Sequence, residues 1–481
     1  MRRSWIAIAL CSITFLACSQ QHGPVVVATE KETKAERGTL DKLPSIGTRK
    51  KGVDWPVFLG PTGDSKSPEK GLILPWPKTG PRIVWETELG ISYGIGSVAS
   101  GRFFQFDRFD KRQGDAGIAR LRCLNAETGE QIWAFEYKTG YRDHYGYNGG
   151  PRCSPIVDGN RVYIYGAGGW LHCLRANDGK LVWKLDTMKQ FGIVQNFFGV
   201  GSNPVIEKGL IIVMVGGSPK SDQTIGAANL DRVSGNGTGI VAFDKYTGKV
   251  KYKITNELAS YSSLKLATID KRRWCFAFCR SGLVGFEPLS GKVDFQYPWR
   301  ATLLESVNAS MPVVVKNEVF ISECYSIGAS LLKVHPGKHK VVWKDSRQRR
   351  AKAMRAHWNT PIHINGYLYG CSGRNPPDAD LRCIEWKSGK VMWTIHNQSR
   401  SSLTYVDGHL IFLGEYGKLA VIKPNPKKLD VVSECIIPVK LGEDPPRSKL
   451  KAPCWAAPVI SHGLLYVRGK DRLICMEVIK K

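Results

Sequence analysis

The sequence predicts an all-β protein, an eight-bladed β-propeller closed by pairing of its N- and C-terminal strands. Three observations predict this fold. A unit of four short strands recurs along the chain, a glycine followed four residues later by an aromatic residue marks most copies, and the repeat is incomplete at both ends in complementary ways. The 50 glycines among 481 residues and the scarcity of helix-period apolar stripes agree with many turns and little helix.

The clearest copy of the unit begins at Ser154. Its turns are Asp158-Gly159-Asn160 and Asn177-Asp178-Gly179, which are typical hairpin signals when they lie between alternating apolar runs. The four strands that these turns and one loop separate are expected at 155–157, 161–165, 170–174 and from 180 onward. The unit therefore has the size and pattern of one propeller blade.

The glycine-plus-four aromatic residue locates the other copies. These pairs are Gly129 and Trp133, Gly179 and Trp183, Gly248 and Tyr252, Gly291 and Phe295, and Gly389 and Trp393. A looser copy carries Gly337 and Trp343, another around 419–422 lacks the glycine, and a last copy ends after its third strand. With the strand pair before Gly129, the units number eight. We expect Trp133, Trp183 and Trp393 to fill the gaps between blades.

The two ends of the chain complete each other. The last unit stops at Val478 without a fourth strand, whereas residues 82–86 carry Trp85 of a fourth strand without the rest of a unit. Pairing 82–86 with 473–478 closes the ring and removes an exposed sheet edge.

One repeat carries a family resemblance. The segment from Ala126 to Trp133 reads Ala-Glu-Thr-Gly-Glu-Gln-Ile-Trp, with Thr128-Gly129 near its centre. It resembles the repeat of pyrroloquinoline-quinone (PQQ)-type propellers, and the segment 244–248 is similar. The resemblance covers 54–481 and implies a quinoprotein dehydrogenase-like propeller. That superfamily includes quinoprotein dehydrogenases and non-enzymatic lipoproteins such as the propeller subunit of the outer-membrane β-barrel assembly machinery. The opening 55–61 also resembles planctomycete-type exported propellers of mostly unassigned role.

The N-terminal residues have the pattern of a targeting segment. Arg2 and Arg3 precede a short apolar run that ends at Ala17-Cys18, which resembles a bacterial lipobox with Cys18 as the lipidated residue. Phe15 departs from the usual leucine, so ordinary cleavage is the alternative. We expect a signal at 1–18, a flexible tether at 19–53 and the propeller at 54–481. These features predict a lipid-anchored protein of the periplasm, outer membrane or cell envelope.

The net charge and the cysteine content limit the partners and cofactors that we expect. The formal charge of +27 favours anionic partners such as acidic glycans or lipid head groups, although solubility alone is the alternative. Export argues against nucleic acid, and we expect a monomer. Four of the 13 cysteines, Cys123, Cys173, Cys383 and Cys475, occupy one repeat position and should lie too far apart to form disulfides. The sequence has no Cys-x-x-Cys, so zinc and attached haem have no support.

The segments that precede the first strand of each unit should reach the propeller axis on one face. They are rich in arginines, amides and aromatic residues, which together fit a polar, flat or sugar-like ligand. The alternative is that these residues only hydrogen-bond the inner strands and fill the channel. The predicted funnel residues are Arg142, Arg152, Asn203, Tyr261, Asn308, Arg355, His357, Trp358, Asn359, Arg400 and Trp455.

The resemblance to quinoproteins implies a testable residue set. Enzymes of that kind use PQQ with Ca²⁺ held by Glu and Asn, an Asp base and a stacking Trp. On this chain Glu305 and Asn308 would hold the cation and Asp143 would be the base, with Trp358 or Trp455 as the platform. The adjacent Cys-Cys pair common in that family does not occur. Two carboxylates beside four arginines favour an anion site instead.

Three functions therefore compete. The leading hypothesis is a non-catalytic binding or scaffold propeller at the cell envelope, with envelope proteins or anionic or polyhydroxylated glycans as partners. The second is a PQQ-dependent dehydrogenase of alcohols or sugars. The third is a carbohydrate-active enzyme, which would need paired carboxylates, whereas the axis segments supply only Asp143 and Glu305 from separate units.

Overall fold

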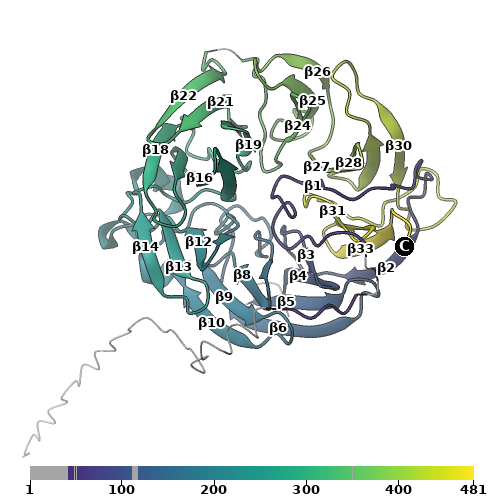
Figure 1. Cartoon of the computed structure of the whole chain (residues 1–481), viewed down its shortest axis with the longest axis horizontal. Coiled ribbons are helices and arrows are strands. Elements are labelled where there is room, and N and C mark those ends of the chain that lie inside the picture. The colour runs from purple at the N-terminus through teal and green to yellow at the C-terminus, as the bar shows by residue number, and fades with distance from the viewer. Residues whose placement is uncertain (1–41, 48, 50, 111–116, 349) are drawn as a thin grey trace, which may run out of the picture.

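The repeats form a ring of eight sheets around a central axis (Figure 1), which confirms the predicted eight-bladed propeller. This computed structural model describes residues 42–47, 49, 51–110, 117–348 and 350–481. The predicted signal segment 1–18, Cys18 and most of the predicted tether lie outside these described residues. No helix within the described ranges is long and apolar enough to cross a membrane.

Each blade has four antiparallel strands, and in blades 1 to 7 the chain runs through them in order from the axis outward. Blades 1 to 4 consist of β3 (Ser97–Ala99), β4 (Arg102–Phe109), β5 (Gly117–Asn125) and β6 (Gln131–Thr139); β7 (Ile156–Asp158), β8 (Arg161–Tyr165), β9 (Trp170–Arg175) and β10 (Leu181–Asp186); β11 (Val205–Glu207), β12 (Leu210–Met214), β13 (Ile240–Asp244) and β14 (Val250–Ile254); and β15 (Lys265–Ile269), β16 (Arg272–Phe278), β17 (Gly282–Phe286) and β18 (Val293–Pro298).

The second half of the ring has the same arrangement, and blade 7 has a short fifth strand in addition. Blades 5 to 8 consist of β19 (Val313–Val315), β20 (Glu318–Glu323), β21 (Gly328–His335) and β22 (Lys338–Lys344); β23 (Ile362–Ile364), β24 (Tyr367–Ser372), β25 (Asp380–Glu385) and β26 (Val391–Ile395); β27 (Ser401–Val406), β28 (His409–Gly414), β29 (Lys418–Ile422) and β30 (Val431–Ile436); and β31 (Val459–Ser461), β32 (Leu464–Arg468), β33 (Arg472–Glu477) and β2 (Ile83–Glu88). The two-residue β1 (Lys66–Ser67) pairs in parallel with β27 on the inner edge of blade 7.

The ring closes as the sequence predicted. Strand β2 pairs antiparallel with β33, from Ile83 opposite Met476 to Glu88 opposite Arg472. Trp85 of this closing strand is 8% exposed and belongs to a cluster of buried residues that joins blade 8 to blade 1. The N-terminal strand thus supplies the edge that the last repeat lacks.

The core lies between the blades, in one apolar cluster for each of the interfaces around the ring. The cysteines at the repeated position, such as Cys123 and Cys383, are buried in different clusters, as expected for small apolar residues in separate interfaces. Packing of this kind makes neighbouring blades interdependent for stability.

A repeated Trp–Gly contact explains the glycine-plus-four pattern. The indole Nε1–H of Trp183 donates to Lys245 O at 3.0 Å in the turn of the next blade, and its ring lies against Gly248 of that turn. A Cβ on Gly248 would lie 3.0 Å from that ring, and its φ of +70° favours glycine. Trp85, Trp133, Trp343 and Trp393 make the equivalent hydrogen bond. The repeated tryptophans are therefore structural, as the sequence predicted.

The segment 55–65 closes one end of the central channel, a role that the sequence did not reveal. Pro56 O accepts from Val157 N at 2.8 Å in blade 2, Lys265 Nζ of blade 4 donates to Thr62 O at 2.8 Å, and Ser65 Oγ donates to Leu403 O at 2.7 Å in blade 7. These bonds to three sides of the ring fix the segment across the axis. We call it the plug (residues 55–65).

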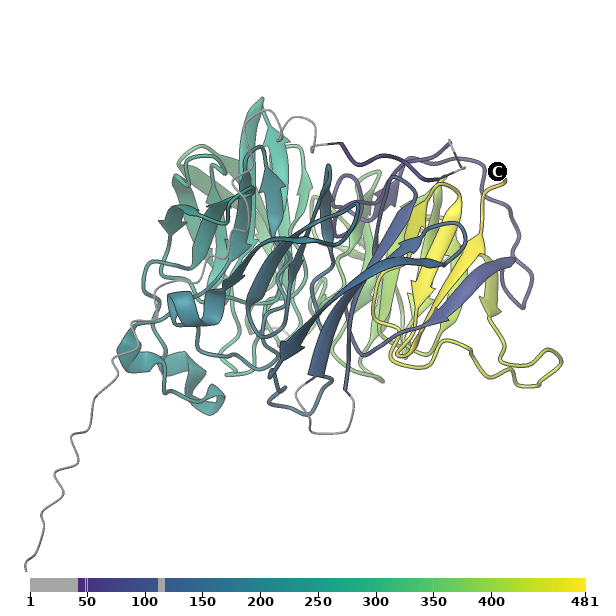
Figure 2. The same cartoon turned by 90° about the horizontal axis from the view of Figure 1, so that it is seen from below.

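Residues before 54 also contact the propeller, which differs from the predicted boundary of the tether. Leu43 is 7% exposed and packs between blades 1 and 2. Pro44 O accepts a hydrogen bond from Arg102 Nη1 at 2.6 Å. Within the described residues, the contacts of the N-terminal segment therefore begin near residue 43. Figure 2 shows this purple segment on one face of the ring and the short teal helices toward the other face.

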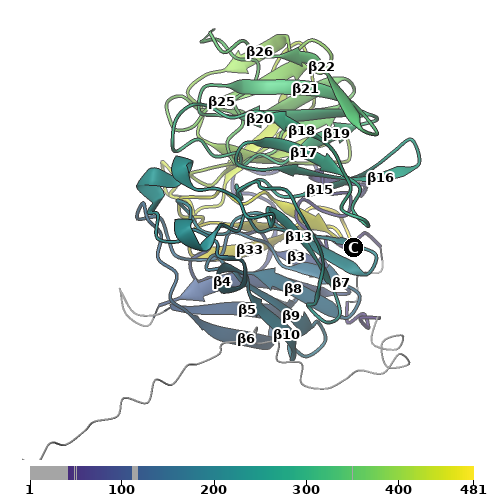
Figure 3. The same ribbon diagram turned by 90° about the vertical axis from the view of Figure 1, so that its left-hand side faces the viewer.

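The insertion at 217–237 is folded against blade 4. It contains η1 (Lys220–Asp222) and η2 (Ala227–Arg232), and α2 (Thr187–Phe191) precedes it. Asp231 Oδ1 lies 2.8 Å from Arg280 Nη2 and 2.8 Å from Arg300 Nη2, so one carboxylate joins the insertion to two arginines of the ring. Figure 3 shows these teal helices projecting from one face of the ring.

His462 joins the N-terminal segment to blade 8 in a pH-dependent way. Its Nε2 lies 3.0 Å from Asp54 Oδ1 and its Nδ1 lies 3.1 Å from Lys51 O. Both partners are acceptors, so both bonds form only when the imidazole is protonated. The hydrogen bond to Asp54 raises the pKa of His462 above its usual value, against the opposing effect of burial.

We expect His462→Gln to destabilise the protein by about 1 kcal/mol or less, and only at acidic to neutral pH. Because the folded-state pKa is raised, the contribution is fully present below the pKa of an unfolded histidine and is lost as pH rises through the folded pKa. The measurement is the difference in melting temperature between wild type and variant across that range. A difference that grows with pH would contradict this assignment.

Candidate functional site: an aromatic cup on the propeller axis

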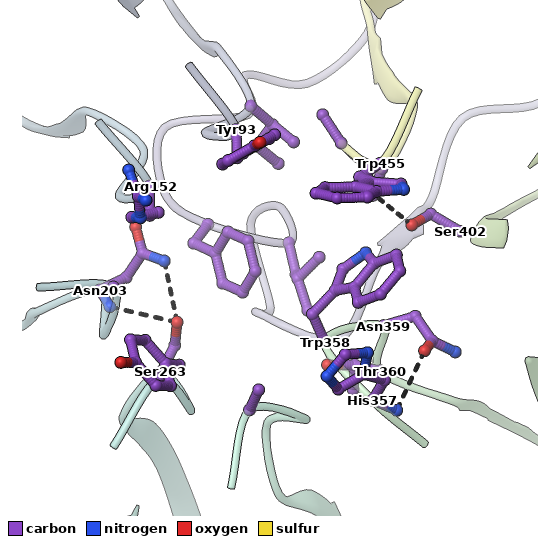
Figure 4. A pocket seen from close by; sticks show the side chains of 18 of the residues that line it. Tyr93, Arg152, Asn203, Ser263, His357, Trp358, Asn359, Thr360, Ser402 and Trp455 are labelled. Carbon is purple, nitrogen blue, oxygen red and sulfur yellow. Dashed lines mark hydrogen bonds between the residues drawn. The ribbon is translucent and has the colours of Figure 1, made fainter. Parts of the chain in front are cut away.

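The plug turns the central channel into a blind cup of about 190 Å³ that opens on the opposite face. Segments that precede or begin the first strands of all eight blades line it, as the repeat pattern predicted, and Phe58 and Leu59 of the plug also contribute. The principal lining side chains are Tyr93, Tyr147, Arg152, Phe198, Asn203, Tyr261, Ser263, His357, Trp358, Asn359, Thr360, Arg400, Ser402 and Trp455. In Figure 4 the labelled side chains among them, from Tyr93 and Arg152 to Trp358 and Trp455, converge on one space from different blades.

Aromatic rings form a nearly continuous wall. Trp455 lies between Tyr93 and Trp358, with ring centroids 4.9 Å and 4.8 Å away. At the rim, Tyr147 is 5.4 Å from Phe198 and 6.2 Å from Trp455, so it reaches between two sides of the mouth. The cup therefore offers several ring faces to a ligand.

Arg400 is held inside this wall as part of a neutral pair. Its Nε donates to Glu415 Oε2 at 2.9 Å, its Nη2 contacts the other carboxylate oxygen, and that same oxygen accepts from Trp455 Nε1 at 2.9 Å. The guanidinium carbon also lies 5.0 Å and 4.6 Å from the ring centroids of Trp358 and Trp455. Glu415, which sequence reasoning missed, thus compensates the charge of Arg400.

Arg152 is compensated in the same way by Asp143. The ion pair is 2.7 Å long, and the Asp143 side chain is only 1% exposed. The carboxylate also accepts from the backbone N–H groups of Tyr145 and Tyr147, at 2.9 Å and 3.1 Å. Asp143 therefore organises the rim loop that carries these two tyrosines, rather than facing the cup as a catalytic base.

The amides of the cup serve the backbone. Asn203 Oδ1 accepts from Ser154 N at 2.6 Å, and Asn359 Nδ2 donates to Cys371 O at 3.0 Å. Tyr261 donates to Asn196 Oδ1 at 2.6 Å, and burial raises its pKa well above the usual value. These residues fix the inner ends of the blades, as the structural alternative to ligand binding proposed.

Two nitrogens in the wall have no hydrogen-bond partner among the described residues, Trp358 Nε1 and His357 Nδ1. Burial, with a smaller effect of Arg400, lowers the pKa of His357 to about 3. The imidazole is therefore neutral at physiological pH.

Three predicted funnel residues lie elsewhere. Arg142 is exposed and does not line the cup. Arg355 is paired with Asp378. Asn308 is buried, and its amide donates to Cys279 O at 2.8 Å and Trp299 O at 3.2 Å. The remaining eight, Arg152, Asn203, Tyr261, His357, Trp358, Asn359, Arg400 and Trp455, line one cavity.

The residues implied for a quinone and Ca²⁺ do not fit that group. Glu305 is exposed, whereas the Asn308 amide is committed to backbone carbonyls inside the fold. The carboxylates that contact cup residues, Asp143 and Glu415, each neutralise an arginine. No group of three or more His, Cys, Asp or Glu in the described part of the chain is arranged to hold a metal. Ca²⁺ requires six to eight oxygen ligands, which this donor set lacks.

The inter-blade tryptophan contacts and the blind axial cup define a propeller of the PQQ-repeat class. A family model described as outer membrane protein assembly factor BamB matches residues 118–395, which is more than half of the chain. The chain therefore belongs to this family. No curated protein matches it.

One solved structure with a TM-score of 0.50 shows the same fold at low identity. The quinohemoprotein alcohol dehydrogenase from Comamonas testosteroni is 13% identical, with 92% of this chain and 84% of that chain covered and a TM-score of 0.50. BamB from Moraxella catarrhalis is 13% identical, with 82% and 99% covered and a TM-score of 0.37. A europium-containing methanol dehydrogenase is 12% identical, with 88% and 91% covered and a TM-score of 0.47.

Proposed function

We propose that the protein is an exported, lipid-anchored binding propeller of the cell envelope that acts without catalysis through its central aromatic cup. The observation that carries this proposal is the state of the ionisable groups around the cup. Asp143 and Glu415 are fully engaged in ion pairs, and His357 is a buried neutral imidazole. A general acid or base instead needs a pKa near the working pH and a free path to the reacting atom.

The cup is built to hold rather than to transform a ligand. It is closed at its base by Phe58 and Leu59, and its wall is dominated by aromatic rings. Membership of a family whose model is described as an assembly factor is in keeping with a non-enzymatic role.

The sequence of the N-terminus supports export and anchoring. We expect Cys18→Ser to release the protein from the membrane fraction into the soluble periplasmic fraction, because the variant cannot accept a lipid. Cys11→Ser, which changes a cysteine inside the apolar run, is the matched control and should leave the protein in the membrane fraction. If both variants remain in the membrane fraction, Cys18 is not the anchor.

The alternative function, a PQQ-dependent dehydrogenase, draws its support from the indole faces of Trp358 and Trp455, which offer a planar platform. A quinone with carboxylate groups would also need cations to bind it. Both guanidiniums in the cup wall already pair with carboxylates, which favours the binding role.

A further inference from the structure

The charge around the cup limits the class of its ligand. The side chain of Arg152 is 10% exposed and that of its partner Asp143 is 1% exposed. The side chain of Arg400 is 14% exposed and that of its partner Glu415 is 5% exposed. Separating either pair would leave a carboxylate buried and unpaired, which is strongly unfavourable. An anion therefore gains little from these arginines. This ion pairing argues against the anion site that the sequence predicted.

The shape of the wall limits the ligand further. The ring of Trp455 lies between those of Tyr93 and Trp358, at centroid distances of 4.9 Å and 4.8 Å. An aromatic face is electron-rich, so it attracts polarised C–H groups, and the flat side of a pyranose ring presents several of them together.

The unpartnered nitrogens indicate what else the ligand carries. Trp358 Nε1 is a donor, and neutral His357 Nδ1 is a donor or an acceptor according to its tautomer. The ring centroids of these two residues are 4.7 Å apart. Buried polar atoms without a hydrogen-bond partner are uncommon in folded proteins, so the pair indicates a missing partner. A hydroxyl group matches both nitrogens in either tautomer of His357 because it donates and accepts, whereas a carboxylate matches both only when Nδ1 carries the proton.

The mouth of the cup continues this surface. Tyr145 and Tyr147 are 51% and 44% exposed at the rim. The exposed aromatic residues extend the contact surface beyond one ring.

We infer that the cup binds an uncharged saccharide, with one pyranose ring against the indoles of Trp358 and Trp455 and further sugar units against Tyr147 at the rim. The inference rests on the proposed binding function and names the ligand class of that site.

The test is isothermal titration of the purified protein with cellotetraose, chitotetraose and maltotetraose, beside tetragalacturonate and a heparin tetrasaccharide of matched length. We expect at least one neutral tetrasaccharide to bind, with an affinity that changes less than about twofold between low and high salt. Trp455→Ala should weaken that binding by roughly tenfold or more. Trp170→Ala, which removes an indole on the third strand of blade 2, is the matched control and should leave it unchanged.

Glu415→Gln tests the charge argument separately. It leaves Arg400 without its carboxylate, so the variant should gain salt-sensitive binding of tetragalacturonate that wild type lacks. If Trp455→Ala does not fold, Tyr147→Ala at the exposed rim replaces it, with an expected loss of roughly threefold or more.

Each outcome decides the inference. Preference of the wild-type protein for the acidic tetrasaccharides, or binding of none of the five, would overturn it. In the second case the proposed non-catalytic function would still stand unless the protein also oxidised alcohols with added quinone. Turnover of that kind would overturn both.

Discussion

A protein that begins at residue 91 should lose about 5 kcal/mol or more of its free energy of unfolding, or fail to unfold cooperatively at all. The truncation removes β2 and the plug. It leaves β33 as an exposed edge and takes the fully buried Trp55 and the nearly buried Trp85 from the interface between blades 8 and 1. The interface between blades 8 and 1 closes the ring, so its loss leaves a poorly packed face on each of these two blades.

Chemical denaturation followed by circular dichroism measures this effect. Trp85→Ala provides a milder variant, because it keeps the β2–β33 hydrogen bonds and removes only the indole and its bond to Ala126 O at 3.0 Å. Ile132→Ala, at a side chain 42% exposed on blade 1, is the control and should change little. A truncated protein that unfolds like the full chain would show that β2 does not close the ring.

Trp183→Ala should destabilise the protein by about 3–5 kcal/mol. The side chain is 1% exposed, packs 6.1 Å from the Tyr163 ring and donates to Lys245 O, so the substitution leaves a cavity and a carbonyl without its donor. Trp133 and Trp393 make the same contact but are partly exposed, so their substitutions should cost less.

Urea unfolding of the three variants checks both the magnitude and the order. Gly248→Ala is a complementary variant, because its Cβ would press against the Trp183 ring at a positive φ. It should destabilise without removing any tryptophan contact atom. Equal stability of Trp183→Ala and wild type would show that the repeated tryptophan is not an inter-blade contact.

The fold was predictable because its turns, its inter-blade contacts and its ring closure each require particular residue types at regular positions in the sequence. Turn glycines such as Gly179 have a positive φ and no room for a Cβ, and the indole four residues onward packs on the next blade, so the two residue types recur together. The orphan strand around Trp85 predicted closure for the same reason. The plug left no comparable signal, because its bonds to blades 2 and 4 use backbone carbonyls that any residue supplies and its bond to blade 7 uses a single serine hydroxyl.

The site was predictable in position and less so in chemistry. Blade periodicity placed His357, Arg400 and Trp455 on one axis, where the structure brings them together. Their charge state depends on Glu415, which lies in a turn between β28 and β29 rather than in an axis segment. Asp143 was in the expected segment, but its carboxylate faces Arg152 and the rim loop. Such pairings arise from tertiary packing, which spacing along one chain does not encode.

The most direct test of a non-catalytic cup is an absorbance titration of the purified protein with pyrroloquinoline quinone and Ca²⁺, followed by dye-linked oxidation of a primary alcohol. The account predicts that the spectrum remains the sum of the free components and that the dye stays oxidised. A saturable shift of the quinone spectrum that disappears in Trp455→Ala, together with quinone-dependent dye reduction that Glu305→Gln abolishes, would contradict it and establish a dehydrogenase.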